Sequence, residues 1–365
     1  MRIVVDCRYT RIDRHDGISR FTANLVAELA RLHPVIMLIN DHRQLEMLPD
    51  QPWEMVSSPT SAREPWVARQ VRRLQPDVVY TPMQTMGGFG RNYRLVLTVH
   101  DLIYYRHRTP PRDLPAPVRL LWRLYHLSWW PQRMLLNRSD AVVAVSETTK
   151  ALIAEHHLTR KPVSVVPNAA AVPERLRAVA ESRTAPVDRI LVYMGSFMPY
   201  KNVDTLVRAA GLLPDYELHL MSKITEPEKE RLRALSPQAR IVFHGGVSDD
   251  TYTRVLLQAT ALVTASHDEG FGIPLVEAMG LGTPVIVSDI PIFREIGGDA
   301  AAYFPADDAV ALAREVRLLE EPQVWASRSA LGRLRAAAYS WRDSAEKLLR
   351  TLEETGVRRV SSRRP

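Results

Sequence analysis

The sequence predicts an α/β protein of two domains, each built on a parallel sheet with helices on both faces. Three observations support this prediction. The 365 residues are too many for one ordinary core and suit two domains. Short β-branched runs alternate with amphipathic stretches along the whole chain, which indicates βαβ units. The strand candidates are almost continuously apolar, as is typical of parallel strands covered on both faces.

Each half of the chain contains about six strand candidates. Those of the first half are RIVVD, VIMLIN, DVVYTP, LVLTVHD, AVVAVS and VSVVPN. Those of the second half are RILVYMG, YELHLM, RIVFHG, ALVTAS, PVIVSD and AAYFP. The alternation breaks at residues 173–188, which carry prolines and charges and are predicted to form a linker. We therefore expect one Rossmann-like domain over residues 1–172 and another over residues 189–339.

A final helix is predicted over residues 340–356, with Ser340 as its N-cap. The following residues, 357–365, are basic and polar and are expected to be disordered.

The composition limits which binding partners and which cellular compartment we expect for the protein. The net charge of +7 favours anionic partners such as nucleic acid, phospholipid head groups or phosphorylated substrates. The single cysteine, Cys7, excludes an intramolecular disulfide and lies in an apolar run, so a buried thiol and a reducing cytoplasm are expected. No run of 18 uncharged apolar residues occurs, so no membrane-spanning helix is expected.

The clearest functional pattern follows the strand candidate ALVTAS. Gly270 and Gly272 form a glycine turn, and Pro274 suits the first turn of the helix after it. The unpaired N–H groups and the dipole of such a helix start favour an anion, especially phosphate. Glu269 and Glu277 flank the turn, where their carboxylates can accept hydrogen bonds from hydroxyls. A nucleotide-sugar site is indicated, and two solvated glutamates at a surface turn are the alternative.

Three further residues lie after strand candidates or before helices. Lys201 follows a glycine turn at a helix start, where it could reach a phosphate, or it could simply be solvated. Gly17 precedes the first amphipathic helix and by itself indicates little. His100 ends a strand, where it could hydrogen-bond a sugar hydroxyl or transfer a proton, although a lone histidine is often structural.

Taken in order along nearly the whole chain, these segments resemble the retaining glycosyltransferases of family four, which have the GT-B fold. The segments that carry the resemblance are DGISRFTANLVAEL, LTVHDLIYY, SDAVVAVSETTKALI with VSVVPNAAAVP, YMGSFMPYKN, FHGGVSDDTYTRVLLQATALVTASHDEGFGIPLVEAMGLGTPVIVSD and REIGGDAAAYFPADD. The resemblance implies two Rossmann-like domains facing each other across a cleft. It also implies that the C-terminal helix crosses back to the first domain.

The resemblance implies roles for five residues. Glu269 would bond hydroxyls of the donor sugar, and Glu277 would bond the ribose. Lys201 would contact the diphosphate, and His100 would orient the donor sugar. Gly17 would let the N-terminal loop close over the diphosphate and the acceptor.

The resemblance also implies that the loops of the second domain line the donor site. These further donor-binding residues are Ser196, Gly246, Val247, Gly270, Phe271, Gly272, Ile273, Pro274 and Leu275. Many family members have an arginine where this chain has Ser196, so the phosphate site is short of one cation. Lys223 or Arg20 could replace it.

The predicted reaction is retaining, metal-independent transfer of a hexose from a nucleotide diphosphate donor to a hydroxyl of a glycan or lipid-linked acceptor, in envelope polysaccharide or glycolipid synthesis. GSFMPYKN and HDEGFGIP resemble relatives that use GDP-mannose, so mannose is favoured, while UDP- and dTDP-sugars remain open. No Asp-x-Asp triplet and no Cys/His ligand spacing indicates a metal. The alternatives are a soluble-acceptor sugar synthase or phosphorylase and, more distantly, a nucleic-acid-binding protein.

Residues 115–140 are basic and rich in tryptophan and leucine. An amphipathic helix of this composition can lie in a lipid interface, or it can pack into the first domain. The membrane interpretation predicts a cytoplasmic protein that binds peripherally to the inner face of the plasma membrane.

Overall fold

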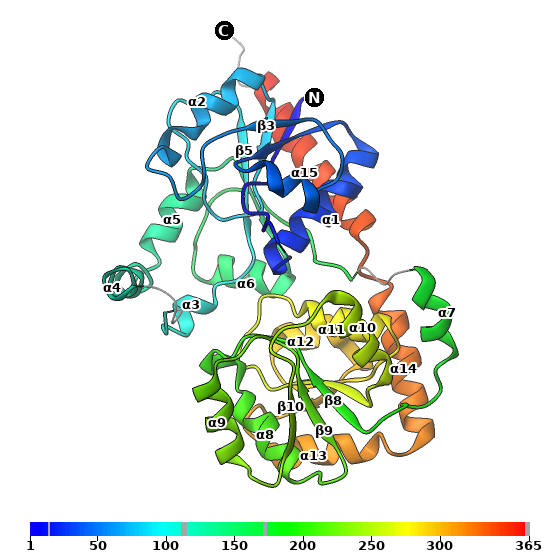
Figure 1. The fold of residues 1–365 in the computed structure, drawn as a ribbon. Helices are drawn as coiled ribbons and strands as arrows, with labels where there is room; N and C mark the ends of the chain where they lie inside the picture. Colours follow the sequence, from blue (N-terminus) through cyan, green and yellow to red (C-terminus); the bar gives the residue numbers. More distant parts are fainter. Residues whose placement is uncertain (14, 111–114, 171–173, 362–365) are drawn as a thin grey trace. The chain divides into compact units, whose positions relative to one another are not determined.

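The structure, a computed structural model, describes residues 1–13, 15–110, 115–170 and 174–361 and divides the chain into two compact units (Figure 1). The first unit contains Met1–Pro110, the described part of residues 114–168 and the segment that begins at Ser340. The second unit contains Ala169–Tyr339. Both units are α/β, each with a parallel sheet, so the predicted fold class is confirmed.

The described part of the first unit contains a seven-stranded sheet of order β3-β2-β1-β4-β5-β6-β7, in which all neighbours are parallel. The strands are β1 (Ile3–Asp6), β2 (Val35–Ile39), β3 (Trp53–Met55), β4 (Val78–Tyr80), β5 (Arg94–Val99), β6 (Ala141–Ala144) and β7 (Val163–Val165). Six of these coincide with strand candidates, and β3 does not. All residues of β3 are exposed at the sheet edge, so pairing with β2 rather than an apolar pattern specifies this strand.

Helices and short 3-10 turns connect these strands. They are α1 (Gly17–Leu32), η1 (His42–Met47), η2 (Glu64–Trp66), α2 (Val67–Val71), η3 (Arg72–Leu74), α3 (Ile103–Arg106), α4 (Ala116–Tyr125), α5 (Trp130–Asn137) and α6 (Glu147–Glu155). Helix α1 forms because the Asp16 side chain accepts from the N–H of Ser19 and because Phe21, Leu25 and Leu29 bury one face. Cys7 is buried directly after β1, as expected.

The segment expected as one tryptophan-rich helix forms two, α4 and α5. Pro131 stands in the first turn of α5, where its missing N–H costs nothing. A proline at this position cannot continue a helix that comes before it. The two helices therefore separate at residues 126–129.

The last helix, α15 (Trp341–Ser361), belongs to the first unit and lies beside α1 (Figure 1). The rings of Trp341 and Phe21 meet at 5.8 Å, and Ser344 donates to the carbonyl of Pro167 at 2.8 Å. Ser340 caps the helix by accepting from the N–H of Asp343 at 3.0 Å. The expected return of the C-terminal helix to the first domain is therefore confirmed. The helix also includes residues 357–361, which were expected to belong to the disordered tail, and residues 362–365 of that tail lie outside the described residues.

The second unit has a sheet of order β10-β9-β8-β11-β12-β13, again with parallel neighbours. Its strands are β8 (Ile190–Tyr193), β9 (Glu217–Leu220), β10 (Arg240–Phe243), β11 (Ala261–Thr264), β12 (Val285–Ser288) and β13 (Ala302–Phe304), and all coincide with strand candidates. In both sheets the strand order reverses beside the first strand of the unit. Such a reversal in a doubly wound sheet is where ligands bind.

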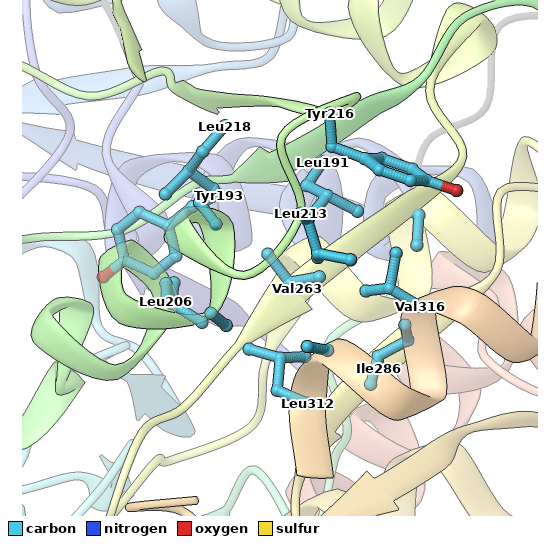
Figure 2. Close-up of a cluster of buried hydrophobic side chains, with 14 of the residues drawn as sticks. Leu191, Tyr193, Leu206, Leu213, Tyr216, Leu218, Val263, Ile286, Leu312 and Val316 are labelled. Atoms are coloured by element: carbon cyan, nitrogen blue, oxygen red, sulfur yellow. The ribbon is translucent and has the colours of Figure 1, made fainter. Parts of the chain in front are cut away.

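Helices cover this second sheet. They are α7 (Glu174–Ser182), within the expected linker, η4 (Pro199–Lys201), α8 (Val203–Gly211), α9 (Glu226–Leu235), α10 (Asp249–Gln258), α11 (Ile273–Gly280), α12 (Pro291–Gly297), η5 (Gly298–Ala300), α13 (Ala309–Leu318) and α14 (Pro322–Ala336). Figure 2 shows the core where Leu206 and Leu312 from two of these helices pack beside strand residues such as Val263. This core holds the strands in register, so their carboxyl ends form one fixed edge.

Candidate donor site and family

The candidate site of the second unit lies where β8 and β11 are neighbours. The loop after β8 carries Lys201, and the loop after β11 carries Glu269. The N–H of His267 donates to the carbonyl of Tyr200 at 2.8 Å and joins the two loops. The structure thereby brings together two predicted residues that are far apart in the sequence.

Lys201 and Glu269 form an ion pair, with 2.6 Å between Nζ and Oε1. Their side chains are only 13% and 16% exposed, so solvent screens the pair less than a surface pair. The same carboxylate oxygen accepts from the hydroxyl of Ser266 at 2.8 Å. The arrangement is a partly buried cation at the carboxyl edge of the sheet, held by one carboxylate that a ligand could replace.

The backbone beside Lys201 is fixed by its neighbour Asn202, which has a left-handed φ of 49°. The Asn202 amide donates to the carbonyl of Ala306 at 2.8 Å and to Asp307 at 3.0 Å, and its oxygen accepts from Thr205 at 3.1 Å. The sequence analysis did not single out Asn202 as a functional residue. Its partners Ala306 and Asp307 lie about a hundred residues away, and no local pattern shows them.

Tyr193, the last residue of β8, contacts the turn that follows this strand. Its hydroxyl donates to the carbonyl of Ser196 at 2.7 Å, which fixes the turn that carries Ser196. Burial raises the pKa of Tyr193 well above its ordinary value, and the nearby Glu269 raises it further. Tyr193 therefore remains a neutral hydrogen-bond donor.

Helix α11 follows its N-cap Gly272, whose φ of +93° is in the left-handed region that favours glycine. No side chain caps this helix, and Pro274 has no N–H. The N–H of Leu275 donates to the carbonyl of Gly272 at 3.0 Å. The amides of Gly272 and Ile273 are therefore the best placed of the expected phosphate donors.

The side chains around this turn differ in what they can offer. Phe271 is buried, and its ring meets that of Tyr339 edge to face at 5.6 Å, so its side chain serves packing. Gly270 precedes Phe271 in the same loop, and Glu277 is half-buried on α11.

The turn after β10 carries the expected donor-binding residues Gly246 and Val247. The N–H of Gly246 is already donated to the carbonyl of Met221 at 3.1 Å, and Ser248 caps α10 by accepting from the N–H of Thr251. Val247 lies half-buried between them. The Lys223 side chain passes so close to Gly246 that a Cβ there would lie 2.8 Å from the lysine Cγ. Lys223 therefore lies at the edge that carries the candidate site.

Two candidates lie in the first unit. Gly17 is the first residue of α1, directly after the cap Asp16. His100 lies 2.8 Å through Nε2 from the carbonyl of Pro82, and its ring meets that of Phe21 edge to face. Burial lowers the pKa of His100, which favours the neutral ring. Because a carbonyl only accepts, Nε2 carries the hydrogen and Nδ1 is an acceptor, suited to a hydroxyl donor. Arg20, the second candidate replacement cation, lies on α1.

A buried network at the end of β1 escaped the sequence analysis. Arg8 donates to Asp6 at 2.8 and 2.9 Å and to Glu64 at 2.6 and 3.2 Å. The alternation of Asp6 and Arg8 at a strand end is the local signal for this pair. Nothing local indicates Glu64.

Within the described part of the chain, no group of three or more His, Cys, Asp or Glu residues is arranged to hold a metal ion. Among the same residues, no helix combines the length and the apolar composition that crossing a bilayer requires.

Comparison with known proteins identifies the family and the fold. The family model for Glycosyltransferase Family 4 matches residues 15–171, and the model for Glycosyl transferases group 1 matches residues 176–341. Together they cover every strand of the two sheets except β1. The chain belongs to the family-four glycosyltransferases, enzymes of the GT-B fold that generally retain anomeric configuration.

Individual relatives are named as mannosyltransferases. The O-antigen chain mannosyltransferase RfbU of Salmonella typhimurium is 28% identical over 68% of this chain and 72% of its own length. The MMP alpha-(1->4)-mannosyltransferase of Mycolicibacterium hassiacum is 26% identical over 73% of this chain and 66% of its own. The serotype-specific mannosyltransferase WbdA of Escherichia coli is 30% identical, but the match spans only 29% of its length.

Solved structures show the same fold. A sucrose-phosphate synthase from Thermosynechococcus elongatus superimposes with a TM-score of 0.72 at 18% identity, covering 97% of this chain and 98% of that one. WaaG, a glycosyltransferase involved in lipopolysaccharide biosynthesis, gives a TM-score of 0.67 at 15% identity over 96% and 99% of the two chains.

Proposed function

We propose that this chain transfers a hexose, with mannose favoured, from a nucleotide diphosphate sugar to a hydroxyl of a glycan or lipid-linked acceptor in envelope polysaccharide or glycolipid synthesis. GDP-mannose is the favoured donor, because several relatives are named as mannosyltransferases. Residues 189–339 would hold the donor, residues 173–188 would link the domains, and residues 1–172 would hold the acceptor. The observation that carries the proposal is the Lys201–Glu269 ion pair beside the start of α11. Glu269 lies three residues before Gly272, the N-cap of α11, which makes no side-chain cap.

In this proposal the diphosphate takes the place of Glu269 on Lys201. The ammonium and the α11 amides would neutralise the charge that grows on the leaving diphosphate, without a requirement for a metal. Glu269 would then be released to accept hydrogen bonds from the donor sugar, and Glu277 would bond the ribose. The Nδ1 atom of His100 would accept from a sugar hydroxyl.

The proposed step retains configuration by attack from the side of the leaving group. The bond between the anomeric carbon and the diphosphate oxygen breaks, and its electron pair stays on the diphosphate. The acceptor oxygen bonds to the same face of that carbon, and its proton passes to the leaving diphosphate. Because the family resemblance implies attack from the side of the leaving group, Glu269 is not assigned as a covalent nucleophile, unlike the paired carboxylates of retaining hydrolases.

A donor screen tests the proposal. GDP-, UDP-, dTDP- and ADP-sugars are compared by thermal unfolding, where a ligand at 100 times its Kd adds about 2.7 kcal/mol to the free energy of unfolding. Stabilisation by GDP-mannose, followed by transfer to a glycan with retained configuration by NMR, is expected. Failure of all four donors to stabilise the protein would contradict the proposal. Production of a sugar 1-phosphate from inorganic phosphate would indicate the phosphorylase alternative.

We also propose peripheral binding to the cytoplasmic face of an anionic membrane through α4. The large apolar side chains exposed on and beside α4 are Val118, Leu120, Leu121, Leu124, Leu127 and Trp130. No acidic residue occurs between Pro115 and Ser139, while Arg119 and Arg123 lie on the same helix. Exposed leucines next to arginines suit a negatively charged lipid interface.

Co-sedimentation with phosphatidylglycerol vesicles tests this surface. Leu121→Glu should abolish binding, whereas Leu334→Glu on α14 should preserve it, because Leu334 is as exposed as Leu121 but lies in the second unit. Absence of wild-type binding at low salt would remove the membrane proposal.

A further inference from the structure

An exposed lysine at the carboxyl edge of the second sheet has no role in the proposed function. Lys223 follows the end of β9 by three residues. It is exposed, and it makes no ion pair or hydrogen bond with any residue that the structure describes. Its ammonium group is therefore available to a ligand that binds at this edge.

The backbone on both sides of Lys223 is held in place. On one side, the hydroxyl of Ser222 accepts from the N–H of Gly195 at 3.2 Å, which joins the loops after β8 and β9. On the other side, Ile224 packs against the hydrophobic core of the unit. The backbone of Lys223 therefore has a defined position, although its side chain reaches solvent.

The stem of Lys223 lies against the loop after β10. A Cβ at Gly246 would lie 2.8 Å from Cγ of the lysine, 3.7 Å from Cδ and 3.3 Å from Cε, so the stem passes directly over this glycine. Gly246 has a φ of +99°, in the region that favours glycine, and its N–H donates to the carbonyl of Met221 at 3.1 Å. The glycine leaves open the space in which the lysine stem lies.

Lys223 and the Lys201–Glu269 ion pair lie at different places along this edge. The strand order is β10-β9-β8-β11. The bond from His267 to Tyr200 holds Lys201 on the β11 side, whereas the stem of Lys223 lies on the β10 side. Strands β11 and β10 are three strand spacings apart, about 14 Å. This separation favours different parts of one ligand as the partners of the two lysines.

The donor of the proposed reaction has a suitable second part. In that proposal its sugar lies at Glu269, and its diphosphate lies at Lys201 and the start of α11. The nucleobase is the other end of the donor and would reach the loops after β9 and β10, where the expected donor-binding residues Gly246 and Val247 lie. The group that Lys223 would meet there is the base.

The chemistry of an ammonium group narrows the base that it can bind. An ammonium donates hydrogen bonds and accepts none. Guanine presents an acceptor oxygen, O6, and thymine and uracil present O4, whereas adenine and cytosine carry an amino group at the corresponding position. An ammonium that faces an amino group meets hydrogens rather than an acceptor. Lys223 therefore suits a base with a carbonyl oxygen at purine position 6 or pyrimidine position 4.

We infer that Lys223 is a specificity-determining residue that donates a hydrogen bond to this carbonyl oxygen of the donor's base and so selects against adenine and cytosine. The inference rests on the proposed glycosyl transfer and narrows its donor. It agrees with GDP-mannose as the favoured donor and disfavours ADP-sugars.

The test uses pairs of nucleoside diphosphates that differ mainly at this position. Inosine diphosphate and ADP carry an oxygen and an amino group at purine position 6, and UDP and CDP do so at pyrimidine position 4. Dissociation constants are measured by isothermal titration calorimetry on the full chain. In at least one pair the carbonyl member should bind roughly tenfold more tightly than the amino member, the effect of one hydrogen bond to a charged group.

Lys223→Met removes the ammonium and keeps an unbranched stem over Gly246. It should weaken binding of the carbonyl member roughly tenfold, change binding of the amino member less than about twofold, and so abolish the discrimination within the pair. Lys223→Arg keeps a cationic donor and should keep the discrimination. Arg314→Met controls for the loss of one positive charge and should change neither member, because Arg314 is exposed on α13, which packs beside β13 at the far side of the sheet from β10.

The outcomes separate this inference from the proposed function. Equal weakening of both members by Lys223→Met would indicate that the lysine binds the diphosphate, and it would overturn the base assignment. Unchanged binding of the carbonyl member, or wild-type binding that discriminates within neither pair, would also overturn it. These results contradict only the role of Lys223. Failure of the wild-type protein to bind any nucleoside diphosphate would contradict the proposed transfer together with this inference.

Discussion

The two units use the same arrangement of central strands, but their cations at the strand reversal differ. In the first unit, Arg8 is fully buried, and two carboxylates and a carbonyl engage all its donors. In the second unit, Lys201 is partly accessible and is held by the single carboxylate of Glu269. One cation fixes a loop, whereas the other can exchange its partner for a ligand.

The helices at the two edges differ in the same way. Asp16 caps α1 with a carboxylate, so that helix start already has its anion. Gly272 leaves the start of α11 without a side-chain cap. The comparison teaches that topology sets the location of a site. Whether the site accepts an anion depends on whether its cation and its helix start are already bound to carboxylates of the protein.

The largest expected effect on stability comes from Arg8→Met. Loss of the guanidinium leaves Asp6 and Glu64 without their cation, and breaking a buried pair costs about 3–5 kcal/mol. Denaturant unfolding of the first unit measures this loss. Arg43→Met, which breaks the exposed pair with Asp41, should cost far less. A similar loss of unfolding free energy in Arg8→Met and Arg43→Met would contradict the difference between the buried arginine and the exposed one.

The largest expected effect on transfer comes from Lys201→Ala. Loss of one oriented charge at the leaving diphosphate should lower kcat/KM roughly tenfold to a thousandfold, as measured by nucleoside diphosphate release. Lys229→Ala, which removes the ion-pair partner of Glu226 on α9, is the control and should leave the rate unchanged. Near wild-type transfer by Lys201→Ala and by Glu269→Gln would show that the site is wrong.

Gly272→Ala should have an intermediate effect. The φ of +93° strains any other residue, and a Cβ would lie 3.1 Å from the Phe293 ring, so we expect a loss of about 1–3 kcal/mol in stability and weaker donor binding. Thermal unfolding with and without donor measures both. Gly88→Ala meets no neighbouring atom and is the control. An unaltered donor shift in Gly272→Ala would count against a phosphate site at α11.

The smallest effect concerns His100. Because burial lowers its pKa, the unfolded chain takes up this proton first as the pH falls. The contribution of His100 is therefore fully present above the unfolded pKa of about 6.5 and is lost as the pH falls through the folded pKa. His100→Gln should make the fall in unfolding free energy between pH 8 and pH 5 shallower. A steeper fall would contradict the neutral ring and its acceptor Nδ1.

Sequence patterns predicted most of the fold because burial on both faces of parallel strands leaves a strong local signal. The strand β3 has no such signal, since β2 rather than a core specifies it. The separation of α4 from α5 depends on Pro131, whose effect a tryptophan-rich pattern hides.

The candidate site was predictable as a set of residues, but its contacts were not. Lys201 and Glu269 each follow a strand, yet their ion pair depends on the adjacency of β8 and β11. Likewise, Gly246 indicated a turn, while its contact with Lys223 and the bond of its N–H to Met221 depend on tertiary structure. Residue types and strand ends are local properties of the sequence. Which partners a charged side chain contacts is a property of the tertiary structure.

The position of α15 has a consequence for synthesis of the chain. This helix completes the first unit, but it is translated only after the whole second unit. At ~5–20 residues per second, the intervening residues delay it by roughly 10–35 s. During that interval the α1 face that receives Trp341 has no cover, and the second unit is completely translated before α15 is. The second unit can therefore complete its fold before the first, although it comes later in the sequence. Chaperones would then bind the N-terminal half while it still lacks its last helix.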